Sequence, residues 1–80
     1  MEILLDVVRV EARTDHTLLV VFENGETRVF DMAPYLGSRP FQPLKDVSLF
    51  SRASVAQGTV VWPGGLDIAP ETLYDRGREP

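Results

Sequence analysis

The dipeptide Asn24-Gly25 constrains this chain more than any other feature of its sequence. It separates two runs rich in β-branched and aromatic residues, 17–23 and 26–31. Asn and Gly both tolerate positive φ, which a type I′ turn requires at its two central positions. The sequence therefore predicts a β-hairpin. A two-residue turn sets the cross-strand pairs Val20–Val29, Phe22–Thr27, Leu19–Phe30, Val21–Arg28 and Glu23–Glu26.

The first strand of this hairpin is apolar on both sides. In the predicted register one face carries Leu18, Val20 and Phe22, and the other carries Leu19, Val21 and Phe30. An 80-residue chain is too short to build three layers, so it has little to cover both faces. We expect one face to take a helix and the other to take a second subunit.

The rest of the chain alternates between short extended and short helical patterns. Further strands are predicted near 5–13, 54–56 and 58–62, the last pair joined by a Gln57-Gly58 turn. Two or three short helices are expected, one capped by Asp46 and the last near 70–76, where Pro70 suits the first helical position. The predicted fold is one α+β domain over 1–80 with a mostly antiparallel sheet. Residues 78–80 are expected to fray.

Size, charge and cysteine content limit the classes of protein. A domain this small buries only roughly 60% of the surface that its unfolded chain exposes, and the chain has no cysteine to form disulfides. Association into a dimer is a physically motivated expectation. The net charge of −4 and the scattered arginines argue against a direct nucleic-acid partner or an anionic membrane. The first ten residues lack a signal-peptide pattern, so we expect a cytoplasmic protein.

Three carboxylates, Asp67, Glu71 and Asp75, have the one suggestive acidic spacing. Oxygen ligands of this kind suit a hard cation such as Mg²⁺ or Ca²⁺. An acidic helix start followed by a solvated helix face explains the same pattern. We favour the second interpretation, and predict no metal, no cofactor and no catalytic residue.

The single histidine and the two aromatic residues near the end of the chain also have plain structural explanations. His16 lies in a predicted turn, where we expect a solvated side chain rather than part of a catalytic group. Trp62 and Tyr74 are expected to pack across the Pro63-Gly64-Gly65 corner, although exposed aromatic side chains can also stack on a ligand.

Three stretches together resemble a known family: LLVVFENGETRVFDMAPYL, FQPLKDVSLFSRASV and GTVVWPGGLDIAPETLYD. They are similar to the bacterial domain of unknown function 2442 over nearly the whole chain from Val7 to Tyr74. The most specific residues are Val60, Trp62, Pro63, Gly65, Asp67, Ile68, Pro70, Leu73 and Tyr74. Family members often have Pro where this chain has Val47, which affects local rigidity only.

The resemblance implies a compact α+β fold in a bacterial cytoplasmic protein, free-standing or ahead of a helix-turn-helix domain. It also implies a gene that lies beside one for another small protein, in a toxin–antitoxin-like arrangement. The family has no established catalytic residues to carry over.

We expect a non-enzymatic protein-interaction module that forms a homodimer or binds a small partner protein. The candidate interaction surface consists of Leu19, Val21, Phe30, Trp62, Asp67 and Tyr74. The alternative is a sensory or regulatory piece of a DNA-binding transcription system. A more remote alternative is a small metal-dependent hydrolase that uses Asp67 and Glu71.

Overall fold

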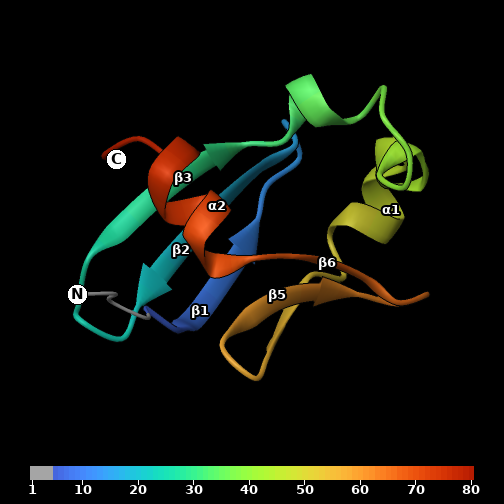
Figure 1. Cartoon of the computed structure of the whole chain (residues 1–80). Helices are drawn as coiled ribbons and strands as arrows, with labels where there is room; N and C mark the ends of the chain where they lie inside the picture. Colours follow the sequence, from blue (N-terminus) through green and yellow to red (C-terminus); the bar gives the residue numbers. More distant parts are fainter. Residues whose placement is uncertain (1–4) are drawn as a thin grey trace.

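The computed structural model describes residues 5–80, which form an α+β domain with two three-stranded antiparallel sheets (Figure 1). Sheet A contains β1 (Val7–Ala12), β2 (Thr17–Phe22) and β3 (Thr27–Asp31), with β2 in the middle. Sheet B contains β4 (Ser54–Ala56), β5 (Thr59–Trp62) and β6 (Leu66–Ile68), with β5 in the middle. The predicted fold class is confirmed. The first four residues of the predicted domain lie outside the described residues.

The hairpin of β2 and β3 forms where the sequence predicts it, but the predicted register is wrong by one residue. Leu18 pairs with Phe30, and Leu19 pairs with Val29. The loop has three residues because the Gly25 amide donates to the Phe22 carbonyl at 2.9 Å, and the Phe22 amide donates to the Glu26 carbonyl at 2.8 Å. This is a type I turn followed by a glycine bulge.

Only Gly25 in this loop has a positive φ, of 87°. The side-chain oxygen of Asn24 accepts a hydrogen bond from the Glu26 amide at 3.0 Å, which favours the longer loop over the two-residue turn. Since side chains alternate along a strand, the one-residue difference moves Phe30 to the other face of the sheet. Phe30 shares that face with Leu18.

Strand β1 is shorter than the predicted 5–13 and contains an irregularity. Its pairing with β2 shifts between Val7 and Arg9, so that Val7 lies opposite Phe22 and Arg9 lies opposite Val21. Val8 lies at this bulge and is 51% exposed. A bulge inserts one extra residue into a strand and increases the local twist.

Sheet B begins with the predicted hairpin. Gln57 and Gly58, at φ 53° and 76°, connect β4 to β5 as a two-residue turn with two left-handed residues. The sequence interpretation missed β6, because Leu66–Ile68 is only three residues long. Its Ile68 pairs with Val60, and Leu66 pairs with Trp62 across the Pro63-Gly64-Gly65 loop. The Val7 amide of β1 donates to the Gly58 carbonyl at 2.9 Å, which joins the two sheets.

The helical segments are short. They comprise two 3₁₀ helices, η1 (Ala33–Tyr35) and η2 (Gln42–Lys45), and two α-helices, α1 (Val47–Phe50) and α2 (Pro70–Arg76). Asp46 caps α1 as predicted, because its carboxylate accepts from the Ser48 amide at 2.9 Å. Helix α2 has the predicted bounds, and Figure 1 shows it lying across sheet A.

Residue Arg78 does not fray. Its backbone pairs with Val29 of β3 through two hydrogen bonds of 2.8 and 2.9 Å. This pairing covers part of the β3 edge, where unpaired backbone groups would otherwise face solvent.

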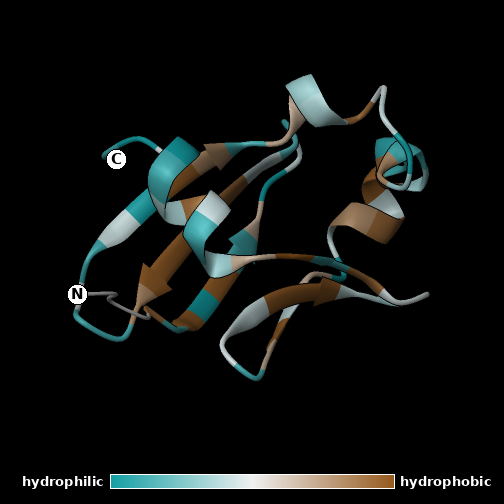
Figure 2. Cartoon of the chain, viewed as in Figure 1, coloured by the Kyte–Doolittle hydropathy of each residue, from teal (hydrophilic) through white to brown (hydrophobic). Residues whose placement is uncertain are grey.

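The core lies between the two sheets and α2. Figure 2 shows hydrophobic residues concentrated along β2 and β5, the central strands. The buried cluster consists of Val7, Leu18, Val20, Phe22, Phe30, Met32, Leu36, Leu44, Phe50, Val60, Trp62, Ile68 and Leu73. Together with the partly buried side chains packed against it, this contiguous core includes most of the large apolar side chains of the described residues.

Candidate functional site

The six candidate surface residues do not form one surface. Phe30 is 1% exposed and belongs to the core, so its predicted place beside Leu19 and Val21 is wrong. The physical reason is the longer hairpin loop, which turns Phe30 inward. Leu19 and Val21 are half-buried on the opposite face of β2. Asp67 is exposed on β6 in the other sheet.

Trp62 is a core residue. It is 3% exposed, and its ring stacks on Phe50 with 5.9 Å between the ring centroids. The indole N–H donates to the Phe50 carbonyl at 2.9 Å. The predicted packing of Trp62 on Tyr74 is wrong, because Tyr74 instead meets Phe22 edge-on at 5.3 Å. The Pro-Gly-Gly loop leads directly into β6, whose Leu66 pairs with Trp62.

His16 is not a solvated turn residue. It has a positive φ of 64°, and its Nε2 lies 2.9 Å from the Leu44 carbonyl oxygen in η2. Its ring centroid lies 4.9 Å from that of Phe50. His16 therefore ties the β1–β2 turn to the helical segment that precedes α1, which is a structural role.

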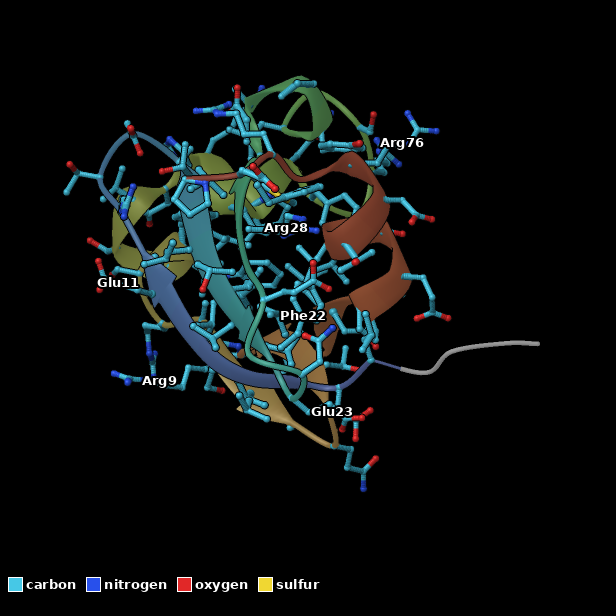
Figure 3. The ribbon with its side chains drawn as sticks, turned by 90° about the vertical axis from the view of Figure 1, so that its left-hand side faces the viewer. Arg9, Glu11, Phe22, Glu23, Arg28 and Arg76 are labelled. Atoms are coloured by element: carbon cyan, nitrogen blue, oxygen red, sulfur yellow. The ribbon has the colours of Figure 1, made fainter. Side chains whose placement is uncertain are left out.

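A polar cluster that the sequence did not reveal joins the hairpin end to α2. The Glu26 carboxylate accepts hydrogen bonds from the Tyr74 hydroxyl at 2.7 Å, from Asn24 at 2.6 Å and from Arg28 at 2.9 Å. The Arg28 guanidinium also lies over the Tyr74 ring, 4.6 Å from its centroid. Figure 3 shows Arg28 directed toward α2. No spacing predicts this cluster, because 48 positions separate Glu26 from Tyr74.

These contacts change the titration of the groups involved. Hydrogen bonds from Tyr74, Asn24 and Arg28 lower the pKa of Glu26, because they stabilise the carboxylate. The same hydrogen bond to Glu26, together with burial, raises the pKa of Tyr74. The Glu26 carboxylate raises the pKa of Arg28. The cluster thus holds a charged carboxylate and a neutral phenol.

A pocket of about 380 Å³ opens beside this cluster. It is lined by Leu5, Asn24, Glu26, Pro70, Glu71, Tyr74 and Asp75. The structure brings Glu71 and Asp75 together here, as their helical spacing predicts, but Asp67 does not line the pocket. Within residues 5–80, no group of three or more His, Cys, Asp or Glu side chains is arranged to hold a metal ion.

The second candidate site is the face of sheet A that carries Leu19 and Val21, which we name the outer face. It consists of Arg9 and Glu11 from β1, Leu19 and Val21 from β2, and Thr27 and Val29 from β3. Val29 lies at the edge where Arg78 pairs with β3, and it is only 6% exposed. Leu19 and Val21 neither belong to the buried core nor pack against it. A shallow hollow of about 280 Å³ lies between Arg9, Val10, Glu11, Leu19 and Val21.

The charged residues on this face are only weakly engaged within the described chain. The Glu11 carboxylate lies 3.8 Å from the Arg13 guanidinium, and both side chains are largely solvated. Arg9 is exposed and makes no ion pair with any of residues 5–80. Figure 3 shows Arg9 and Glu11 projecting away from the ribbon on the β1 side of the domain.

The described helices are all short, and none of those in residues 5–80 has the length and apolar character to cross a membrane. The fold and these surfaces define a small α+β domain with two antiparallel sheets, one of which presents an open face. The chain belongs to the family described as Protein of unknown function (DUF2442), whose family model matches residues 7–79. The resemblance seen in the sequence is thus confirmed. Searches among curated proteins and among solved structures give no significant match.

Proposed function

We propose that this protein is a cytoplasmic, non-enzymatic protein-interaction module, and that its binding surface is the outer face of sheet A. The observation that carries the proposal is the contrast between the two sides of β2. Leu18, Val20 and Phe22 are at most 1% exposed, whereas Leu19 and Val21 lie outside the core on the other side. Apolar side chains on an open sheet face gain free energy when a partner covers them.

The properties of the Glu26 cluster support a non-enzymatic function. A general base works best when its pKa lies near the working pH. The three hydrogen bonds to Glu26 lower its pKa, which moves the carboxylate away from that range. Both of its oxygens already accept hydrogen bonds from the chain itself. The cluster is suited to fixing α2 against the hairpin.

The test is a double substitution, L19K/V21K, which places two charges on the outer face. A matched control is V47K, because Val47 is an exposed apolar residue that belongs to α1 and not to sheet A, and it is 38% exposed. Light scattering measures self-association, and co-expression with the product of the neighbouring gene measures heterotypic binding. Circular dichroism verifies that both variants are folded.

We expect L19K/V21K to lose whichever association the wild-type protein shows, and V47K to retain it. A wild-type protein that neither self-associates nor binds the neighbouring product contradicts the proposal. Association that survives in a folded L19K/V21K variant contradicts the choice of surface.

A further inference from the structure

The outer face of sheet A has a symmetry that its residues and register reveal. The strand pairing arranges it in two rows across the sheet. One row is Arg9, Val21 and Thr27; the other is Glu11, Leu19 and Val29. Each row has an apolar residue in the middle and a charged residue on β1, and the two charges have opposite sign.

A two-fold axis exchanges these rows. The axis lies in the plane of the face, perpendicular to the strands, and passes over the row of Val10, Val20 and Arg28 that separates them. Rotation about it places Arg9 of one copy opposite Glu11 of the other, and Leu19 opposite Val21. The face is therefore complementary to itself, as the shared patch of a two-fold dimer must be.

From this arrangement we propose that the partner of the outer face is a second copy of this chain. This inference rests on the proposed function and specifies its partner. The two sheets pack face to face with their β1 strands antiparallel, within about 30° of alignment as twisted sheets require. Leu19 and Val21 of both copies form the centre of the interface, and two Arg9–Glu11 ion pairs flank it.

The charges select this orientation over the other two-fold arrangement. An axis parallel to the strands and centred on β2 places β1 over β3 of the second copy, where Arg9 and Glu11 face the uncharged Thr27 and Val29, and Arg78 pairs with Val29 at the edge beyond them. The perpendicular axis instead pairs both charges of each copy. Opposite charges across an interface fix its register, and like charges exclude other arrangements.

The size of the face sets the expected strength of the dimer. Three strands spaced about 4.8 Å apart, with six residues that rise about 3.3 Å each, give a face of roughly 14 by 20 Å. Its projected area of roughly 280 Å² per copy is smaller than the roughly 800 Å² per partner of a standard specific interface, so the dimer is expected to be weak. We expect a reversible dimer, with a monomer fraction that rises on dilution.

The experiment is a charge reversal on each side of the ion pair. In R9E both pairs become Glu against Glu, and in E11R both become Arg against Arg. We expect each variant alone to weaken the dimer by roughly tenfold or more. We expect R9E/E11R to dimerise like the wild type, because it restores both pairs. An equimolar mixture of R9E and E11R should form heterodimers.

Analytical ultracentrifugation over a range of concentrations measures these equilibria. The controls are R52E and D67R, which make the same charge changes at exposed positions outside the outer face. A wild-type protein that stays monomeric overturns the proposal that the partner is a second copy of this chain. The proposed function is still upheld in that case if L19K/V21K loses binding to the product of the neighbouring gene. A wild-type dimer that R9E and E11R do not weaken, or that their mixture does not restore, overturns the two-fold arrangement.

Discussion

The two faces of sheet A are built from the same strands, but only the inner face belongs to the buried core. The inner face, with Leu18, Val20, Phe22 and Phe30, is covered by the core, and Leu73 of α2 is buried with it. On the outer face, Leu19 and Val21 lie outside the core among charged neighbours, and Val29 at the β3 edge is buried. In an 80-residue chain, the core built against this face, with the side chains packed on it, takes most of the large apolar residues of 5–80. The comparison teaches that an apolar strand can stabilise the fold with one side and remain available for binding with the other.

The strongest test of the difference in burial between the two faces is to truncate Phe30. The sequence placed this residue on the outer face, and the structure places it on the inner one. We expect Phe30→Ala to lower the free energy of unfolding by about 3–5 kcal/mol, because it leaves a cavity in the core. The control is Leu19→Ala, for which a loss of less than about 1 kcal/mol is expected because little buried surface is removed. Urea denaturation measures both variants. Comparable losses in the two variants would show that the two faces are not distinct.

A second test asks whether the inner face continues into sheet B. Trp62→Phe removes the indole donor to the Phe50 carbonyl and part of the ring volume. We expect the free energy of unfolding to fall by about 1–3 kcal/mol, although the Ala53 amide still donates to that carbonyl. Thermal unfolding followed by circular dichroism measures the loss. An unchanged midpoint would mean that Trp62 is not held as described.

A third test addresses the turn that assigns residues to the two faces. Gly25 has a φ of 87°, and a Cβ added there meets no atom within 4 Å. Gly25→Ala should therefore lower the stability by about 1–2 kcal/mol through backbone strain alone. Gly37→Ala is the matched control, since Gly37 has equal space and no left-handed φ. Equal stability of the two variants in urea denaturation would argue against the bulged loop.

The smallest effect expected is a pH dependence at the edge between β3 and α2. The folded state lowers the pKa of Glu26 below its ordinary value of 4.5, so the stability that the carboxylate contributes is present above that pH. It is lost as the pH falls through the lower, folded pKa. In the same acid range Asp15 contributes with the same sign, because hydrogen bonds from Thr17 lower its pKa.

Glu26→Gln isolates the first contribution. We expect the denaturation midpoint of the wild type to fall more steeply below pH 4.5 than that of the variant, which retains the Asp15 contribution but lacks that of Glu26. Tyr74 contributes a pH dependence of the opposite sign at high pH. Because its pKa is raised, its contribution is present below pH 10.0 and is lost as the pH rises through the folded value. Parallel acid profiles for wild type and variant would contradict the role given to Glu26.

Local signals predicted much of the fold. Asn24-Gly25 and Gln57-Gly58 each placed a hairpin, Asp46 placed the start of α1, and Pro70 placed the start of α2. These succeed because positive φ, a capping carboxylate and a missing amide act within a few residues. The three-residue strand β6 was missed, because so short a segment becomes a strand only when β5 pairs with it.

The candidate site was predicted only in part. Leu19 and Val21 were identified from the alternation along one strand, and both lie on the open face. Phe30 was misplaced because a difference of one residue in the loop reverses the face of every later residue in the strand. The contact of Glu26 with Tyr74 had no signal in the sequence, because it depends on where α2 packs against the hairpin.

By itself, the sequence determined most of the elements of this protein and the two-sided character of β2, because alternation, turns and caps are properties of neighbouring residues. Only the tertiary structure decided which side of β2 became the core. It also decided that Arg9 and Glu11 flank the exposed side, since strand register is settled by pairing between segments. The physical reason is that burial is collective: a side chain is inside only when distant parts of the chain close over it.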